Sequence, residues 1–290
     1  MKKAKLSFLV LFLFLLASVH AQLFWKISGN GLQKPSYLFG THHLIEKERV
    51  PDFDKITAFI PQTEAVVGEM DMSNQLKMQL KMMKYMFMKD TTMHQLLADS
   101  EYTMVDAALK EVMGKGLDQL GRMRPAMLSA MYEMLLFQKE ANLKKQPEAL
   151  DIIIQTKGRK AKKKIVGFET IDQQCNMLFE KLSLTEQAQG MVKMMEDKQK
   201  LVRLIAELNA AYVKGDLAAI SRLSKEEDGM TEHEMQVMLT DRNANWIGQL
   251  KQLLPQKSCF IAVGCMHLVD EQGLIEQLRQ LGYTVEAVRL

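Results

Sequence analysis

Apolar residues form short continuous runs near both ends of the chain, whereas the middle shows the three- and four-residue spacing of helices. The first two runs, 23–28 and 36–40, flank Gly29-Asn30-Gly31 and predict a β-hairpin with a wide loop. Further buried strands are predicted where mostly apolar runs stand between polar turns, at 64–69, 164–168, 259–264 and 283–288.

Helical spacing dominates the chain between these strands. Asp52 is predicted to cap a short helix that Pro61 ends, and Pro255 and Gly282 are predicted to follow the ends of two later helices. A stripe of Leu and Met residues marks the helix at 74–89. The predicted helices are 52–60, 74–89, 102–113, 125–139, 148–157, 185–213 (one helix or a pair), 215–223, 232–253 and 271–281.

The predicted strands lie at the two ends of the chain, so a single sheet must draw on both ends. No Pro- or Ser-rich linker separates them. We therefore predict a single α+β domain, in which a mixed sheet is assembled from N- and C-terminal strands around a large helical insertion.

The start of the chain has the three parts of a secretory signal peptide: a lysine-rich beginning, an apolar run at 6–16 and the small residue Ala21. The apolar run is shorter than the roughly 20 residues that a membrane-spanning helix needs. We predict a signal peptide at 1–21 and a secreted or periplasmic domain at 22–290, with no stable membrane insertion after cleavage. An uncleaved anchor is the alternative. A lipoprotein anchor is not expected, because Gln22 is not a cysteine.

The charge balance argues against a nucleic-acid partner. The chain contains 38 Lys and Arg against 35 Asp and Glu, and three of the lysines lie in the predicted signal peptide, which leaves 35 against 35. Nucleic-acid-binding domains carry clustered positive charge. The one basic cluster, 157–164, precedes a predicted strand and is interpreted as a solvated turn, with an acidic partner or a membrane surface as the alternative.

Three cysteines, Cys175, Cys259 and Cys265, are too few for a disulfide framework. One pair could form in an oxidising compartment, Cys259 with either of the others, and geometry decides this. The 23 methionines are interpreted as a soft, adaptable helical core. A groove that accepts varied apolar peptides or lipids is the alternative.

One phrase occurs twice in the chain, namely an apolar strand followed by Gly-x-x-His-Leu. It covers 37–44 and 260–268 and presents His43, with His42 before it, and His267 beyond two predicted strand ends. Open sheets with helical covers bind ligands at that edge. We predict that the two strands lie in one sheet with their turns facing each other, so that the histidines converge on one metal ion or substrate. A structural role for each histidine is the alternative.

Carboxylates accompany the histidines, since Glu69 and Glu169 also stand at predicted strand ends. Imidazole and carboxylate together suit a divalent ion such as zinc or manganese, with one position left for water. A carboxylate that is not a ligand could take the proton of that water. Arg242 could hold a substrate carboxylate or stabilise an oxyanion, and Asn243 could orient a ligand. The alternative for this Arg-Asn pair is a surface patch.

Several familiar catalytic signatures are absent from the sequence. His233-Glu234 begins like the zinc-protease helix motif, but Val237 stands where the second histidine is required. The chain contains no phosphate-binding loop, no Gly-x-Ser-x-Gly and no Gly-x-Gly-x-x-Gly. These absences exclude the usual serine hydrolase and dinucleotide-binding classes.

At these residues the chain resembles the TraB/GumN family, which includes the Tiki metalloproteases. The resemblance rests on two Gly-x-x-His motifs, an early glutamate, a Gly-Leu-Glu-Thr-like segment and a late Arg-Asn pair, and it extends from Leu23 to Val288. In this chain the motifs are 40–43, 264–267, Glu69, 167–170 and Arg242-Asn243.

Two positions depart from the family pattern. Phe168 replaces a leucine, and Cys265 stands where a small residue is usual. The thiol could be a third ligand, an oxidation target or an apolar filler, and we favour the filler. Position 42 is variable in the family pattern, so His43 is preferred over His42.

The resemblance implies an exported metal-dependent hydrolase with a peptide substrate, and a small-molecule substrate is also compatible with it. His43, His267 and Glu69 would bind a divalent ion of the zinc, manganese or cobalt type, or its water. The alternative is a non-catalytic protein of the same fold that sequesters a peptide or another ligand. The predicted catalytic residues are Glu69, His43, His267, Arg242, Asn243 and Glu169.

Overall fold

The computed structural model describes residues 23–141, 143, 146–225 and 230–290. The predicted signal peptide, 1–21, lies outside the described residues. All six strands of the sheet and all three hydrophobic clusters of the described chain lie after residue 22.

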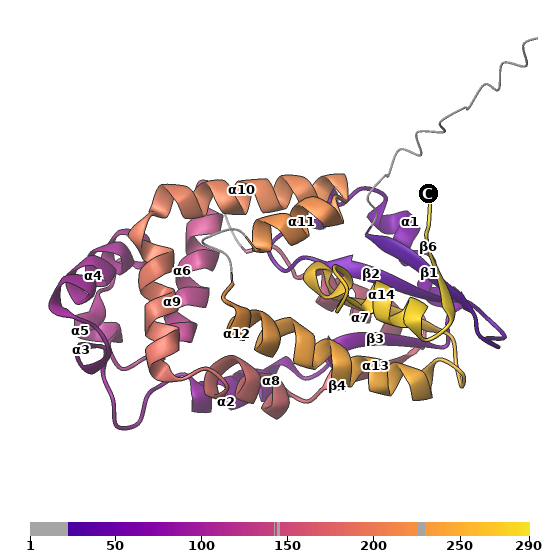
Figure 1. Ribbon diagram of the computed structural model, residues 1–290, viewed down its shortest axis with the longest axis horizontal. Helices are drawn as coiled ribbons and strands as arrows, with labels where there is room; N and C mark the ends of the chain where they lie inside the picture. Colours follow the sequence, from indigo (N-terminus) through magenta and orange to yellow (C-terminus); the bar gives the residue numbers. More distant parts are fainter. Residues whose placement is uncertain (1–22, 142, 144–145, 226–229) are drawn as a thin grey trace, which may run out of the picture.

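A six-stranded mixed sheet forms one side of the molecule, with the strand order β4-β3-β5-β2-β1-β6 (Figure 1). The four strands β4, β3, β5 and β2 run parallel, whereas β1 is antiparallel to both of its neighbours. The strands are β1 Phe24–Gly29, β2 Ser36–Thr41, β3 Ala65–Met70, β4 Lys164–Glu169, β5 Cys259–Gly264 and β6 Tyr283–Ala287. The predicted α+β fold, with strands from both ends of the chain and a large helical middle, is confirmed.

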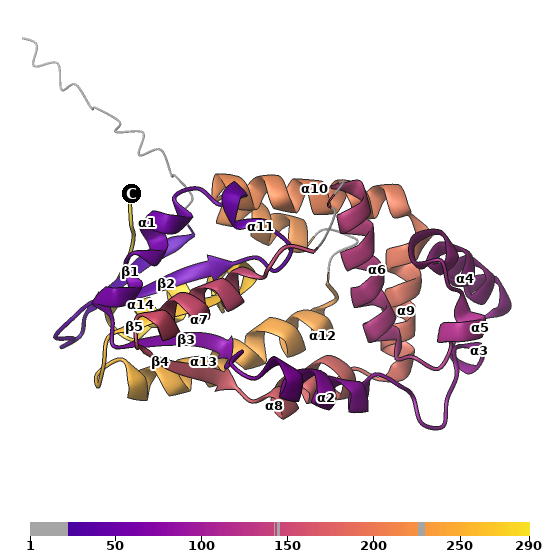
Figure 2. The ribbon, with the colours of Figure 1, turned by 180° about the vertical axis from the view of Figure 1, so that it is seen from behind.

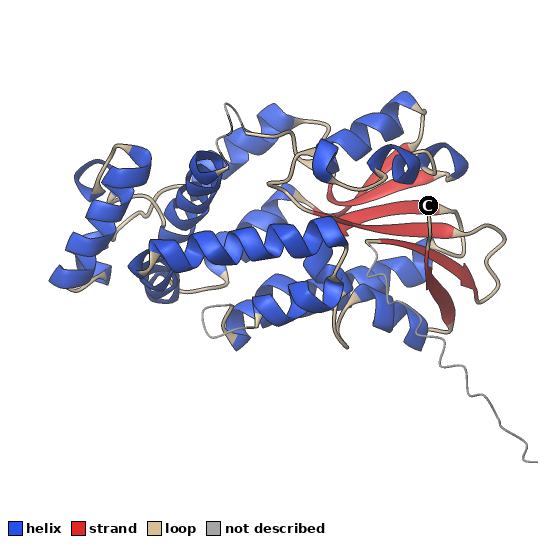
Figure 3. Ribbon diagram, turned by 90° about the horizontal axis from the view of Figure 1, so that it is seen from above, coloured by secondary structure: helices blue, strands red, loops and turns tan. Residues whose placement is uncertain are grey.

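The helices fall into those that cover the sheet and those that form a separate lobe beside it (Figure 3). Most of them lie in the two long crossovers between β3 and β4 and between β4 and β5. The α-helices are α1 Phe53–Thr57, α2 Gln75–Tyr85, α3 Met93–Leu96, α4 Asp99–Met113, α5 Leu117–Leu120, α6 Pro125–Glu140, α7 Leu150–Lys160, α8 Ile171–Glu180, α9 Leu184–Glu196, α10 Lys198–Lys214, α11 Leu217–Ser224, α12 Glu232–Met235, α13 Asp241–Leu253 and α14 Leu274–Gln280.

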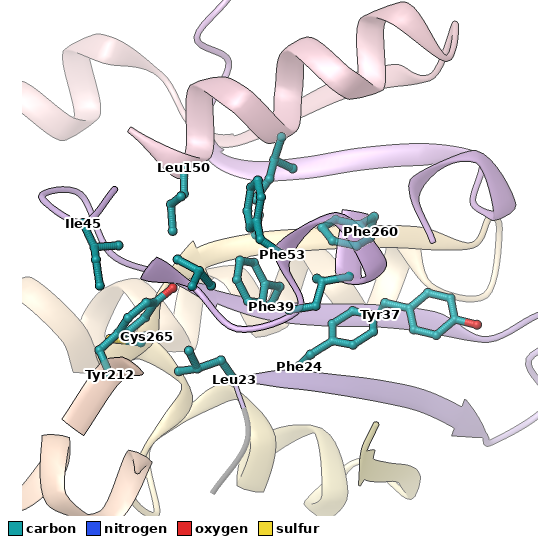
Figure 4. Close-up of a cluster of buried hydrophobic side chains, with 14 of the residues drawn as sticks. Leu23, Phe24, Tyr37, Phe39, Ile45, Phe53, Leu150, Tyr212, Phe260 and Cys265 are labelled. Atoms are coloured by element: carbon teal, nitrogen blue, oxygen red, sulfur yellow. The ribbon is translucent and has the colours of Figure 1, made fainter. Parts of the chain in front are cut away.

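Both faces of the sheet are buried, which explains why its strands read as continuous apolar runs. In the central strands β2, β3 and β5, successive residues alternate between two hydrophobic clusters, one on each face of the sheet. Phe39 and Phe260 pack in the first cluster with α1, α7, α10 and α11, while Leu38 and Ile261 pack in the second with α13 and α14. In Figure 2 α7 lies in front of the sheet, and Figure 4 shows the aromatic side chains of the first cluster around Phe39.

Local signals account for most of the element boundaries. The hairpin turns through Gly29, Asn30 and Gly31, all three with positive φ, as its glycines predict. The prediction at 185–213 resolves into the pair α9 and α10, and a π-helical turn, Gln236–Thr240, joins α12 to α13. Helix α8 was not predicted, although Thr170 and Gln173 form its capping box.

One local prediction holds only in part, and another was wrong. Asp52 is the N-cap residue of α1, as predicted, but it has a positive φ and makes no side-chain cap hydrogen bond. Pro61 lies inside a 3-10 turn, Ile60–Gln62, after the helix has ended. Proline is tolerated in the first turn of such a segment because its missing N–H would have no helical partner there.

The helical lobe has a methionine-rich core. Its buried cluster combines leucines and aromatic residues with six methionines, Met88, Met93, Met123, Met127, Met191 and Met195. Unbranched thioether side chains fill irregular gaps between short helices. The three cysteines are buried and free, so no disulfide contributes to the described structure. Among the described residues, no helix is long and apolar enough to cross a membrane.

Helix α7 approaches β3 so closely that Gly158 leaves no room for a side chain. A Cβ at Gly158 would lie 2.7 Å from Cγ2 of Val66 and 3.1 Å from Cδ1 of Ile165. Gly248, in α13, has no atom within 4 Å of the same position. We expect Gly158→Ala to destabilise the protein by about 1–3 kcal/mol through overpacking. Gly248→Ala should instead stabilise it by up to about 1 kcal/mol through helix propensity. Urea unfolding measures both, and equal effects would contradict this packing.

Candidate functional site

The carboxyl ends of four parallel strands meet at one edge of the sheet, where the two Gly-x-x-His turns are neighbours. Strand β2 pairs directly with β5, with Gly40 opposite Val263 and Thr41 opposite Gly264. A Cβ at Gly40 would lie 3.0 Å from Cβ of Cys265, so glycine permits the close approach of the turns. The prediction that the two strands share a sheet, with adjacent turns, is confirmed.

Arg242 on α13 holds two carboxylates together at this edge. Its Nε and Nη2 donate to Oε1 and Oε2 of Glu169 at 2.8 and 2.9 Å, a bidentate pair. Its Nη2 also donates to Oε2 of Glu69 at 2.6 Å. The three side chains retain only 10%, 7% and 12% of their surface, for Arg242, Glu169 and Glu69 respectively. The three charged groups are therefore stabilised by one another inside the protein rather than by water.

Glu69 is the point where β3, β5 and α13 meet. Its Oε1 accepts the N–H of Gly264 at 2.9 Å, and Gln174 of α8 donates to its Oε2 at 3.4 Å. Burial raises the pKa of Glu69, but the neighbouring charges outweigh it and the pKa falls to about 2. These neighbours are His267, Arg242 and His43. The guanidinium carries this effect at neutral pH because it is permanently charged. Glu69 is therefore an anion.

His267 is held as a neutral ring of defined tautomer. Its Nδ1 lies 2.7 Å from Oδ1 of Asn243, which can only accept, so Nδ1 carries the proton. Asn243 is oriented in turn because its Nδ2 donates to the carbonyl of Gln272 at 2.8 Å. The unprotonated Nε2 lies 3.1 Å from Nη1 of Arg242 and 3.9 Å from Oε1 of Glu69. Burial lowers the pKa of His267 to about 3.

Trp246, one helical turn after Arg242, packs against the side chains of the network. Its Nε1–H donates to Oε1 of Glu169 at 3.0 Å. The guanidinium carbon of Arg242 lies 4.7 Å from the centroid of the Trp246 ring, and the imidazole of His267 is 4.3 Å away. Sequence reasoning did not assign Trp246 a role, although its four-residue spacing from Arg242 puts both on one helix face.

His43 belongs to a second pair at the same edge. Its Nδ1 lies 3.2 Å from Oδ2 of Asp151 on α7, and Thr41 donates to the other oxygen of Asp151 at 3.0 Å. This contact with Asp151 raises the pKa of His43 above its ordinary value. Since 63% of the His43 side chain is exposed, the ring is open to a ligand. No local signal in the sequence marks Asp151, which lies in the apolar first turns of α7.

His42 has a structural role. Its Nδ1 accepts the N–H of Leu44 at 3.1 Å, and its ring meets that of Tyr212 edge-on at 5.2 Å. Burial lowers its pKa to about 4, so the ring is neutral. The geometry thus agrees with the choice of His43 over His42 as the site histidine.

The predicted site residues fall into two adjoining groups. Glu69, Glu169, Arg242, Asn243 and His267 form one continuous hydrogen-bonded network. His43 stands apart in its pair with Asp151, and it is close enough to lower the pKa values of both Glu69 and His267. The part of the chain that the structure describes contains no cluster of three His, Cys, Asp or Glu residues that could hold a metal ion.

Comparison with known proteins gives one match. The model of the TraB/PrgY/gumN family matches residues 23–287, which is nearly all of the chain after the predicted signal peptide. No curated protein and no solved structure matches the sequence.

Removing Arg242 should be costly, because it would leave two buried carboxylates without their cation. We expect Arg242→Met to lower the free energy of unfolding by about 3–5 kcal/mol. As a control, Lys198→Met removes an ion pair with Glu111 whose side chains are 30% and 54% exposed. Exposed pairs contribute only about 0–1 kcal/mol. Urea unfolding of both variants tests this, and similar losses would contradict a central role for Arg242.

The buried neutral His267 should make the protein sensitive to acid. Its folded pKa of about 3 lies below the ordinary value of 6.5, so between these values the unfolded chain binds a proton that the folded protein does not. The contribution of His267 to the free energy of unfolding is then fully present above pH 6.5. It falls by about 1.4 kcal/mol per pH unit as the pH decreases toward 3. Because His42 also has a lowered pKa and contributes a slope of the same sign, His267→Gln should reduce the total slope by about this amount, which urea unfolding at pH 6.5 and about pH 5 measures. An unchanged slope in the variant would mean that His267 is protonated in the folded state.

Proposed function

The chain belongs to the TraB/PrgY/gumN family, and from this membership and the geometry at the sheet edge we propose that it is an exported metal-dependent hydrolase that acts on peptides. The observation that carries the proposal is the pairing of an anionic Glu69 with a neutral His267 whose Nε2 lone pair is directed to the same point. The signal-peptide pattern at 1–21 supports export.

The side chains at this edge are of the chemical types that bind a divalent cation. Neutral imidazole and ionised carboxylate are the ligands of zinc and manganese sites. Metal-binding histidines commonly donate the N–H of their second nitrogen to an amide or carboxylate oxygen, as His267 does to Asn243. Nδ1 of His43 faces a carboxylate in a similar way, 3.2 Å from Oδ2 of Asp151. His267, Glu69 and His43 would therefore hold the ion. When bound, it would lower the pKa of a water molecule and polarise a substrate carbonyl.

The charge balance of the site also favours a cationic ligand. Three carboxylates, Glu69, Glu169 and Asp151, face one guanidinium and the single imidazole of His43, whose pKa is raised. Even with His43 protonated, one negative charge has no counterpart in this group. An added cation would compensate it in surroundings that screen charge poorly.

Arg242 is the competitor of any such ion, because its Nη1 contacts Nε2 of His267. Metal binding would require Nη1 to withdraw from the imidazole, while Nε and Nη2 can retain Glu169. The released Nη1–H would then be free to bind a substrate carboxylate or a developing oxyanion, the role expected for an arginine at such an edge.

The remaining residues of the site position the proposed ligands and Arg242. Both oxygens of Glu169 already accept from Arg242, and one also accepts from Trp246, so its role is to position the guanidinium. Asn243 orients His267 rather than substrate. Asp151 contacts Nδ1 of His43, so Nε2 would be left to bind the ion or to carry a proton in general acid–base catalysis.

A specific observation favours a second candidate, a non-catalytic protein that sequesters a peptide or a similar ligand at the same edge. Glu69, Glu169 and His267 satisfy one another through Arg242, so this network is complete without an ion. In that case the guanidinium is the permanent cation of the site, and exposed His43 provides the contact with the ligand.

Metal binding separates the two candidates. Residues 22–290 should bind about one Mn²⁺, Zn²⁺ or Co²⁺ ion per chain in equilibrium dialysis, and His43→Ala and His267→Ala should each abolish that binding. His94→Ala, an exposed histidine on α3, is the matched control and should retain it. Full binding by the double variant His43→Ala/His267→Ala would remove the metal site.

Turnover tests the hydrolase itself. Digestion of a peptide library by residues 22–290 should yield products that a chelator prevents and added metal restores. Glu69→Gln keeps the shape of the side chain but removes its charge, and we expect it to lower kcat by roughly 100-fold or more. Saturable peptide binding without products would identify the sequestering protein instead.

A further inference from the structure

The exposed large hydrophobic side chains of the described residues are concentrated in one place. Leu76, Leu80, Met83 and Phe87 are 66%, 55%, 58% and 52% exposed, and Leu290 is the remaining member of this class. Single exposed leucines are ordinary on protein surfaces, whereas a contiguous exposed patch indicates an interaction site.

Three of these side chains, Leu76, Leu80 and Met83, form a stripe along one face of α2. Their spacing of four and three residues places them above one another on the helix. The opposite face is fixed to the protein, since Met82 and Tyr85 pack against the core of the helical lobe. Lys81 also pairs with Asp172 of α8. The stripe is therefore held facing outward on an anchored helix, which Figure 1 shows beside α8 at the lower margin of the molecule.

Phe87 extends the stripe just beyond the helix. Met86, the C-cap, keeps helical dihedral angles, and Phe87 forms an isolated bridge with Met123. Phe87 is thus an exposed aromatic residue on a paired backbone, two residues after the helix that carries the stripe.

The charges beside the stripe are all positive. Lys77 and Lys84 are exposed and lie about 70–90° around the helix from the stripe, by the 100° step of an α-helix. Lys81 and Lys89 belong to the same segment, and no Asp or Glu occurs between Asp71 and Asp90. The segment stands out because it has four lysines and no acidic residue, whereas 35 basic and 35 acidic residues balance over the whole chain after residue 21.

The pairing of apolar and basic side chains decides between possible occupants. A second copy docked on the stripe would bring two sets of lysines together and be opposed by their repulsion. An apolar peptide would cover the stripe but would offer the lysines no negatively charged partner. A surface of anionic lipids accepts both, because leucine, methionine and phenylalanine enter the acyl boundary while lysines extend to the phosphates.

We propose that α2 is a membrane-docking helix for anionic lipid surfaces. The helix lies parallel to the membrane, with Leu76, Leu80, Met83 and Phe87 in the boundary between headgroups and acyl chains. Lys77 and Lys84 contact lipid phosphates. This attachment is peripheral and spans nothing, and it does not rest on the hydrolase function. Since α2 follows β3 through a short turn, docking would hold the Glu69 edge of the sheet near the lipid surface.

Vesicle flotation with residues 22–290 tests the docking without the apolar segment at 6–16. The chain should bind vesicles of equal parts phosphatidylglycerol and phosphatidylcholine roughly tenfold or more tightly than vesicles of phosphatidylcholine alone. The variant Leu76→Gln/Leu80→Gln/Met83→Gln should lose about tenfold or more of this affinity. Its substitutions lie on exposed positions, and an unchanged unfolding midpoint confirms that it folds.

The lysines need a matched control. Lys77→Gln/Lys84→Gln should abolish the preference for anionic vesicles, whereas Lys115→Gln/Lys251→Gln, which removes the same charge from two exposed lysines elsewhere, should retain it. Equal binding to both kinds of vesicle, or full binding by the apolar triple variant, would overturn the proposal. So would loss of a dimer in that variant, measured by sedimentation, without vesicle binding by the parent chain, since the stripe would then contact a second copy.

Discussion

The guanidinium of Arg242 is the interaction on which the arrangement of the sheet edge depends. Glu69 and Glu169 end two neighbouring parallel strands and are almost fully removed from water. Two carboxylates in such a place would repel each other and would each lose hydration worth several kcal/mol. One planar cation with several fixed donors satisfies both and reaches the ring of His267 as well. A lysine at this position could not make the same set of contacts.

This constraint links helix α13 to the strands. Arg242, Asn243 and Trp246 lie in the first two turns of α13 and bind Glu69, His267 and Glu169 at the edge. The position of α13 against the sheet is therefore specified by directional polar contacts in addition to the apolar packing of Trp246 and Ile247. Directional contacts of this kind select one arrangement among those that hydrophobic burial alone would allow.

The same network accounts for the protonation states at the site. The imidazole of His267 is neutral and the carboxylate of Glu69 is ionised, and both lie beside the guanidinium of Arg242. These states are compatible because each hydrogen bond then has one donor and one acceptor. The His43–Asp151 pair differs, since its imidazole is exposed and its pKa is raised. The edge thus combines a rigid, satisfied half with an accessible half, and a ligand would reach His43 from solvent before it disturbs Arg242.

The sequence by itself determined the elements and their chemistry at the strand ends. Continuous apolar runs predicted strands buried on both faces, and Gly40 and Gly264 predicted the turns that follow β2 and β5. These signals are local, because backbone conformation and periodicity depend on residues a few positions apart. The predicted strand ends marked Glu69 and Glu169, and the family motifs included these residues together with Arg242 and Asn243, all of which the fold does bring together.

Only the tertiary structure decided which side chains are partners. Asp151 carries no mark in its own helix, yet it is the neighbour of His43, and Asn243, expected to orient a ligand, orients His267 instead. The stripe of α2 reads the same in sequence whether it faces a core or the solvent, and here it faces the solvent. Periodicity fixes which residues share a face, but what covers that face depends on elements distant in the chain. Hydrogen bonds act over about 3 Å, so their partners are set by the folded positions of those elements.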